Sequence, residues 1–247
     1  MQYNSVTLHV IPPTARWDGN SDGDGDNTSW HDPLNWSRDT LPSPSDDVVI
    51  DMADDPVIVH SSGATQIKSL VSTEAIELRG GSLEILNAST IEGDFAVSDS
   101  GALIVTSDLV FDGAFTLSGG EVSGTHEMTL NGPFTWSGGT LAGGARTTVA
   151  GSGTIEGVEP KFIVDSHTFN NQGTLTWTGT RRFTATGDAG RSGHAVRLAG
   201  ARYAACRHQP SDARYVSRFI RATAQRSGGP GIHRRVPCGR CERLCRR

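Results

Sequence analysis

The sequence is poor in charge, in aromatic residues and above all in lysine. Charged residues make up 20% and aromatic residues 6% of the 247 residues, and Lys68 and Lys161 are the two lysines. No apolar run approaches the ~18 residues of a membrane-spanning helix. The first ten residues lack a basic segment followed by an apolar one, so we expect no signal peptide among them. Scarce lysine and 30 glycines favour an all-β chain of short strands over a helical bundle.

Cysteine is also missing from most of the chain, because all four cysteines lie in residues 191–247. That segment holds 14 of the 22 basic residues, all of them arginine, and 2 of the 27 acidic residues. Its net charge is therefore +12, whereas residues 1–190 carry −17. We interpret 191–247 as an unstructured Arg-rich tail that a change of reading frame has produced. The alternative is a nucleic-acid-binding or metal-binding tail, with Cys238, Cys241 and Cys245 in a CxxCxxxC spacing and His233 or Cys206 available as a fourth ligand.

The middle of the chain repeats every 19 or 20 residues. Phe115-Thr-Leu-Ser-Gly-Gly recurs as Phe134-Thr-Trp-Ser-Gly-Gly, and Leu83 corresponds to Leu103. A second apolar column is predicted through Leu70, Ile91, Val110, Leu130 and Val149. Downstream, Gly153 and Ile155 are matched to Gly173 and Leu175, and one coil near residues 140–153 is expected to be about 14 residues long in its glycine column.

These repeats predict a parallel β-helix with one coil per repeat and a right-handed winding. Each unit holds short runs of period-two alternation separated by glycine pairs, which a helical repeat would not show. Inward side chains are expected to stack like on like, and Thr116, Thr135 and Thr176 to form an outward ladder. A β-sandwich is the alternative, but it does not require a constant spacing of equivalent residues.

Residues 16–51 contain the most specific pattern, W-D-G…W-x-D-P-x-N-W…L-P…D-D-V-x-I. It resembles the segment that opens β-helical repeat regions in large bacterial secreted and surface proteins, of the autotransporter-passenger and filamentous-haemagglutinin types. The resemblance implies an extracellular or cell-surface location and a place within a longer polypeptide. The matching residues are Trp17, Trp30, Asn35, Trp36, Leu41, Pro42, Asp46, Asp47, Val48 and Ile50.

The three tryptophans of this pattern, Trp17, Trp30 and Trp36, are predicted to form a structural cap on the first coil. Each large ring can bury ~150–250 Å² and shield the apolar end of the solenoid. The alternative is a glycan-binding module in which an exposed tryptophan pair stacks on sugar rings.

An Asp-rich stretch between the first two tryptophans resembles the first half of a calcium loop. Its oxygen-bearing side chains follow the D-x-N-x-D-G spacing that hard cations favour. The twelfth position is Ser29 rather than a bidentate glutamate, so a solvated acidic turn is the alternative. The candidate calcium ligands are Asp18, Asn20, Asp22, Asp24 and Asp26.

Glu74, Asp94 and Asp112 precede equivalent strands, so stacked coils would place their carboxylates in a row. Such a row could do the acid–base chemistry of a polysaccharide lyase or hydrolase. Against this, residues 63–180 hold four basic side chains, and none is spaced to join the row. We therefore expect a protein that is not an enzyme.

The sequence thus predicts four segments: 1–14 as a linker or the end of a preceding domain, 15–51 as the Trp-rich cap, 52–190 as the solenoid and 191–247 as the tail. The function predicted is a structural or adhesive segment of a large exported bacterial protein that contacts a cell-surface glycan or matrix. A carbohydrate-active β-helix enzyme is the second hypothesis. No membrane span and no nucleic-acid partner is expected of this chain.

Overall fold

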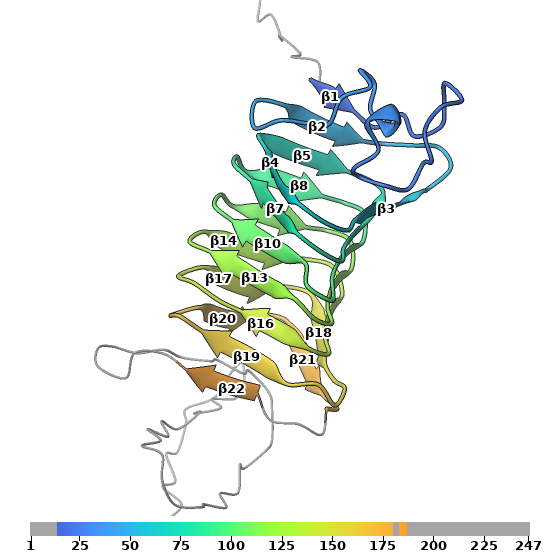
Figure 1. Cartoon of the computed structure of the whole chain (residues 1–247). Helices are drawn as coiled ribbons and strands as arrows, with labels where there is room; N and C mark the ends of the chain where they lie inside the picture. Colours follow the sequence, from blue (N-terminus) through green and yellow to red (C-terminus); the bar gives the residue numbers. More distant parts are fainter. Residues whose placement is uncertain (1–13, 180–182, 187–247) are drawn as a thin grey trace, which may run out of the picture.

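The computed structural model describes residues 14–179 and 183–186, which form a β-solenoid of about seven turns. Its strands are parallel and stack in three sheets along a rod, with β1 at one end and β22 at the other (Figure 1). This confirms the predicted parallel β-helix. The expected linker before Thr14 and the expected tail over 191–247 lie outside the described residues.

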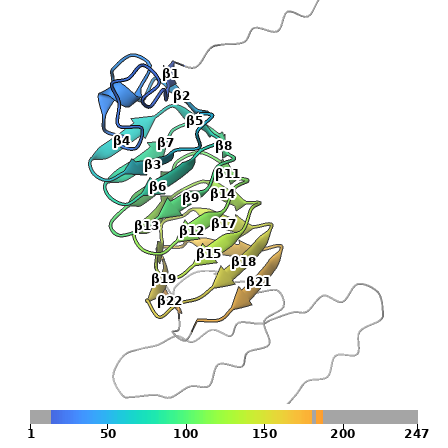
Figure 2. The same cartoon turned by 90° about the vertical axis from the view of Figure 1, so that its right-hand side faces the viewer.

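Each coil contributes one strand to each sheet, and loops of the N-terminal segment cover one end of the stack (Figure 2). The first sheet has the order β1 (Ala15–Arg16), β2 (Asp47–Ile50), β5 (Ser69–Ser72), β8 (Ser89–Ile91), β11 (Leu109–Phe111), β14 (Glu127–Leu130), β17 (Arg146–Val149) and β20 (Thr168–Asn171). The second sheet has the order β3 (Val57–His60), β6 (Ala75–Leu78), β9 (Phe95–Val97), β12 (Phe115–Leu117), β15 (Phe134–Trp136), β18 (Ser152–Ile155) and β21 (Thr174–Trp177). The third sheet has the order β4 (Ala64–Ile67), β7 (Ser82–Ile85), β10 (Ala102–Val105), β13 (Glu121–Gly124), β16 (Gly139–Leu141), β19 (Lys161–Val164) and β22 (Phe183–Thr186).

The core is built from side chains that stack in register from coil to coil. Phe115 pairs with Phe95 on one side and with Phe134 on the other, and its ring lies parallel to that of Phe95 at 5.8 Å between centroids. All three phenylalanines are almost completely buried. Period-two alternation in strands of three or four residues therefore directs one face of every sheet inward.

The outward threonine ladder also forms as predicted. Thr116 pairs with Thr135, and two further coils place Thr154 and Thr176 in the same row. The hydroxyl side chains lie on the outer face of the second sheet.

The predicted second column is wrong at two of its five positions. Ile91, Leu130 and Val149 share a column, but Ser72 and Phe111 occupy the places in it that were predicted for Leu70 and Val110. The outward Val110 is the neighbour of Phe111, and Leu70 belongs to the column of Ser89 and Leu109. At Val110 the prediction slips by one residue, which is possible because β11 has apolar residues on both faces, and the slip moves the side chain to the opposite face. At Leu70 it slips by two residues and stays on the buried face, because the true member, Ser72, is polar.

The predicted short coil near residues 140–153 is also wrong. Phe134 pairs with Gly153, which is the ordinary step of 19 residues. The next coil is longer than this one, because Gly153 pairs with Leu175 and not with the predicted Gly173. Gly153 faces inward, where an added Cβ would lie 2.7 Å from a methyl group of Leu175. The phenylalanine column therefore ends at Phe134, and Phe169 from the first sheet packs against Phe134 instead.

Glycines are required at the corner between the first and second sheets by close packing rather than by an unusual φ. A Cβ on Gly113 or Gly132 would lie 2.3 or 2.1 Å from a carbonyl oxygen of the preceding coil. Neither residue has a positive φ. At the next corner, by contrast, Gly81 and Gly120 have φ values of 67° and 61°, as expected for turn glycines.

Candidate functional site

The three tryptophans gather at the end of the rod that β1 and β2 form. The Trp17 and Trp36 rings meet edge to face at 4.9 Å, and the Trp30 and Trp36 rings do so at 5.0 Å. Their exposures are 0–1%, and the indole Nε1 of Trp36 donates to the carbonyl oxygen of Trp30 at 2.9 Å. Because no ring face is exposed, none of the three can stack on a sugar in this conformation.

A buried asparagine organises the loops around these rings. Asn35 is 0% exposed, and its Nδ2 donates to Asp26 Oδ1 and to the carbonyl oxygen of Ser29, both at 2.8 Å. Its Oδ1 accepts from the backbone N–H of Asn27 at 2.8 Å. Asp32 caps the short 3₁₀ helix η1 (Pro33–Asn35) by accepting from the N–H of Leu34. The D-P-x-N-W pattern thus encodes a capped turn that aims Asn35 into the loop.

Asp26 is the anionic partner in this loop. Its Oδ1 also accepts from the backbone N–H groups of Thr28 and Ser29, at 2.9 and 2.8 Å. The hydrogen bond from Asn35, followed by that from Ser29, lowers the pKa of Asp26 below its usual value.

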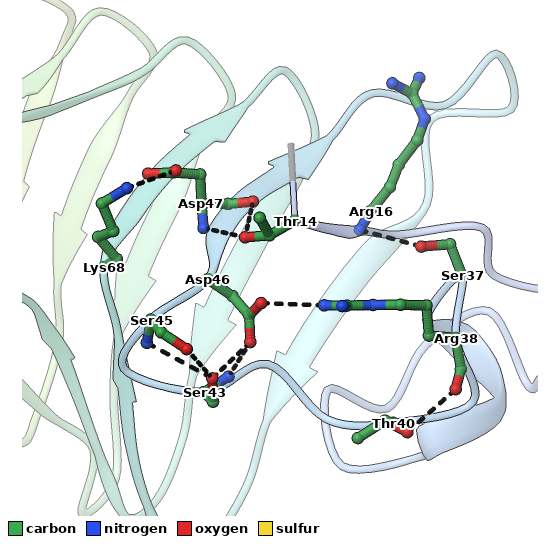
Figure 3. A network of polar contacts seen from close by, with 10 residues as sticks. All are labelled: Thr14, Arg16, Ser37, Arg38, Thr40, Ser43, Ser45, Asp46, Asp47 and Lys68. Atoms are coloured by element: carbon green, nitrogen blue, oxygen red, sulfur yellow. Dashed lines mark hydrogen bonds and ion pairs between the residues drawn. The ribbon is translucent and has the colours of Figure 1, made fainter. Parts of the chain in front are cut away.

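A second polar network fastens this segment to the first coil (Figure 3). Asp46 accepts from the hydroxyl and backbone N–H of Ser43, at 2.6 and 2.8 Å, and from Arg38 at 2.9 Å. Burial alone would raise the pKa of Asp46, but these hydrogen bonds outweigh burial and lower it to about 2. The backbone N–H of Asp46 donates to the carbonyl oxygen of Ser43, with Pro44 at the second position of the turn.

The adjacent Asp47 joins three neighbouring segments. Its backbone N–H donates to the hydroxyl of Thr14 at 2.6 Å, and its carboxylate accepts from Lys68 at 2.7 Å (Figure 3). The carboxylate also accepts from the hydroxyl of Ser69 at 2.6 Å. The two aspartates of the D-D-V-x-I pattern therefore have different partners. Asp46 forms hydrogen bonds within the loop that precedes β2, and Asp47 forms hydrogen bonds to the residues that flank β2 on either side.

The candidate calcium ligands are not gathered around one point. Asn20, Asp22 and Asp24 are exposed, and the Oδ1 of Asp26 is occupied by N–H donors. Burial, and next the negative charge of Asp22, raise the pKa of Asp18. Within residues 14–179 and 183–186, no three His, Cys, Asp or Glu side chains are grouped so that they could hold a metal ion.

The predicted row of Glu74, Asp94 and Asp112 does not form. Because Phe111 pairs with Ile91, the following residues Asp112 and Glu92 are aligned. Because Phe115 pairs with Phe95, the preceding residues Ala114 and Asp94 are aligned. Glu74 aligns with Gly93 and is almost fully buried, with its Oε1 accepting from the backbone N–H of Met52. The turn has the same length in each of these coils, running from Ser72 to Ile76, from Ile91 to Phe95 and from Phe111 to Phe115. Glu74, Asp94 and Asp112 do not share a column because they are the second, third and first residues of their turns.

Another set of charged residues does stack in register. Glu127 pairs with Arg146, Arg146 pairs with Thr168, and the register of the following strands places Asp108 beside Glu127. These residues line a shallow groove of about 310 Å³ along the first sheet, together with Thr125, His126 and Gly144. A second open groove, of about 580 Å³, lies between the N-terminal loop and the second sheet and is lined by Asp26, Asn27, Thr28, Pro56, Val57, Val59, Glu77 and Arg79.

Two histidines far apart in sequence also meet. His31 follows Trp30, His60 ends β3, and their ring centroids lie 4.5 Å apart. No spacing in the sequence joins them, although the alternation Val57-Ile58-Val59-His60 places His60 on the inward face with Ile58.

No protein-family model, curated protein or solved structure matches this chain. In the part of the chain that the structure describes, no helix is long and apolar enough to cross a membrane. The resemblance of residues 16–51 to exported bacterial repeat proteins therefore stays a prediction.

Proposed function

We propose that this chain is a structural, non-enzymatic segment of a large exported bacterial surface protein and acts there as a spacer. The observation that carries the proposal is the course of the chain, which enters the rod at β1 and reaches the opposite end at β22 (Figure 1). Seven coils at ~4.8 Å each add roughly 30 Å between whatever precedes and follows them. The pattern of residues 16–51 supports an exported location.

The outer surface supports a contact role for the same rod. The row of Thr116, Thr135, Thr154 and Thr176 offers hydroxyls at the regular spacing of the coils. Residues 1–190 carry a net charge of −17, which favours partners that tolerate or complement negative charge. A cell-surface glycan or matrix is the partner class that we propose.

Protease treatment of intact bacteria tests the proposed location. The complete gene, with its flanking DNA, is expressed from its own promoter in the host, and the cells are treated with an external protease. We expect fragments of this chain to appear in the supernatant while a cytoplasmic marker enzyme stays intact. Retention of the chain in the cytoplasm after lysis would contradict the proposal.

The stacked charges of the first sheet favour a second candidate, a carbohydrate-active enzyme. Asp108, Glu127 and Arg146 come from successive coils and line one groove, which the Glu74, Asp94 and Asp112 set does not do. Incubation of the full chain with acidic polysaccharides, followed by measurement of new reducing ends or unsaturated products, distinguishes the two. Turnover that Glu127→Gln abolishes would establish the enzyme; absence of turnover supports the spacer.

A further inference from the structure

The contact between His31 and His60 lies where the N-terminal loop rests on the first coil. The two rings meet edge to face, at 66° between their planes, and the Trp30 ring lies 5.9 Å from His60. His60 is 0% exposed and His31 is half-buried. The N-terminal loop thus contacts the solenoid through a pair of titratable groups.

The hydrogen bonds of His60 show which form of the ring the structure holds. Its Nδ1 lies 2.8 Å from the carbonyl oxygen of Gly80, which only accepts, so Nδ1 carries a hydrogen. Its Nε2 lies 2.9 Å from the hydroxyl of Thr65, which donates to the neutral ring. The hydroxyl can turn to accept from a protonated ring, so the cost of protonation comes mainly from burying a charge.

The charged groups around the pair do not compensate such a charge. Strand β4 carries no ionisable side chain, and on β6 and the turn after it Glu77 and Arg79 pair with each other. On the loop side, the carboxylate of Asp32 accepts from the N–H of Leu34. Among the described residues, no carboxylate forms an ion pair or hydrogen bond with either ring. The Nδ1 of His31 is buried there without a hydrogen-bond partner.

Beside the histidines, the loop closes the N-terminal edge of the second sheet. The N–H of Val59 donates to the carbonyl oxygen of Thr28 at 2.8 Å. The N–H of Trp30 donates to the carbonyl oxygen of Val59 at 3.0 Å. An uncovered edge would present unpaired backbone groups to other strands. The segment that satisfies this edge is therefore the one that carries His31.

We propose that His31 and His60 form an acid-sensitive latch, whose protonation releases residues 28–36 from β3 and uncovers the edge of the second sheet. Two imidazolium rings at 4.5 Å would repel each other where no carboxylate is present to offset the charge. The backbone hydrogen bonds of Val59 join the loop that carries His31 to the strand that carries His60, so we expect protonation to break them.

The direction of the pH effect follows from burial. Desolvation lowers the pKa of both histidines below 6.5, and His31 lowers the pKa of His60 further. The unfolded chain therefore binds protons at a higher pH than the folded one. Stability from the neutral pair is present above about 6.5 and is lost as the pH falls below that value. Asp26, Asp46 and Asp47 have lowered pKa values, so their effects lie at lower pH.

His167, at the other end of the rod, is a third buried histidine whose protonation would also affect stability, so the test must measure each region separately. It is buried, its Nδ1 lies 2.9 Å from the carbonyl oxygen of Ala142, and burial lowers its pKa. Hydrogen exchange of the full chain, measured by mass spectrometry at pH 7 and pH 5 and corrected for intrinsic rates, separates the two regions. We expect at least ~10-fold loss of protection at pH 5 in peptides over 28–36 and 57–60, and none over 109–117.

Two variants test whether the loss of protection at pH 5 comes from His31 and His60. His31→Phe keeps an aromatic contact and removes one charge, so it should reduce the loss of protection at pH 5, whereas His167→Gln should leave it unchanged. Equal loss across all peptides, no loss at pH 5, or a full response in His31→Phe would overturn the proposal. Imidazole ¹⁵N shifts of the unaltered chain give an independent test that needs no variant: an ordinary pKa near 6.5 for both His31 and His60 would also overturn it.

Discussion

The N-terminal segment and the body of the rod are stabilised in different ways. In the body, one coil resembles the next: Phe115 has an equivalent above and below it, and backbone hydrogen bonds join successive strands. In residues 14–50, side-chain hydrogen bonds join pairs that do not recur along the rod, such as Asn35 with Asp26 and Arg38 with Asp46. Substitutions in the body should therefore have graded effects, whereas single changes in the N-terminal segment should disrupt many contacts together.

The largest effect is expected for Trp36→Ala. The ring contacts both other tryptophans and its Nε1 hydrogen bond is buried, so its loss leaves a cavity between them. We expect the free energy of unfolding to fall by about 3–5 kcal/mol, measured by urea denaturation. The control is Phe162→Ala, which removes an aromatic side chain that is 38% exposed, with a loss below ~1 kcal/mol. Similar losses for both variants would show that the tryptophans do not organise this end.

Asn35→Ala should be next in size. It removes two donated bonds and one accepted bond in a fully buried place, and it leaves polar groups of Asp26, Asn27 and Ser29 with fewer partners. With about 1–3 kcal/mol for each group left unsatisfied, we expect a total loss near 3 kcal/mol in the same assay. Asn87→Ala, in an exposed turn, should change stability by less than ~0.5 kcal/mol. A loss below ~1 kcal/mol for Asn35→Ala would contradict this role.

Asp46→Asn should have a smaller effect that depends on pH. The variant loses the charge that Arg38 and Ser43 stabilise, so we expect a loss of about 1–2 kcal/mol at neutral pH. Because the pKa of Asp46 is about 2 in the folded chain and has its ordinary value of 3.8 in the unfolded chain, this stabilisation is present above pH 3.8 and is lost as the pH falls toward 2. Denaturation curves at several pH values should therefore converge for variant and wild type in acid. A constant difference down to pH 2 would contradict the assignment.

The smallest effect is expected on the outward ladder of the body. Thr135→Val keeps the β-branched shape and removes a hydroxyl on the outer face, flanked by Thr116 and Thr154. The free energy of unfolding should change by less than ~0.5 kcal/mol in urea denaturation. A loss above ~1 kcal/mol would show that the hydroxyl ladder stabilises the rod.

The sequence predicted the architecture well where large residues repeat. Phe115 with Phe134 and Leu83 with Leu103 are true neighbours, because a constant spacing of bulky inward residues fixes the register. It failed where inward positions are small or where both faces are apolar. Gly153 gives no hydrophobic signal, and Val110 lies next to Phe111, so both were assigned to the wrong column.

The site was less predictable than the fold. Tryptophans are recognisable as buried residues from their size, and the structure does bury all three. The hydrogen bonds of Asn35 and the meeting of His31 with His60 depend on how one loop folds over the end of the rod. The carboxylate row failed because Glu74, Asp94 and Asp112 lie at different positions within turns of equal length, and polar turn residues give no hydrophobic signal that fixes their register.

Distances between spin labels along the second sheet test the central claim, that the chain is a rod with one coil per repeat. In a cysteine-free variant, labels on Val59 and Thr176 are six coils apart in the pairing register, and labels on Ala96 and Thr176 are four coils apart. At ~4.8 Å per coil, the backbone separations should be about 29 Å for the first pair and about 19 Å for the second. The two separations should therefore be proportional to the number of coils between the labels. Separations that do not increase with the number of intervening coils would contradict the solenoid and with it the proposed spacer.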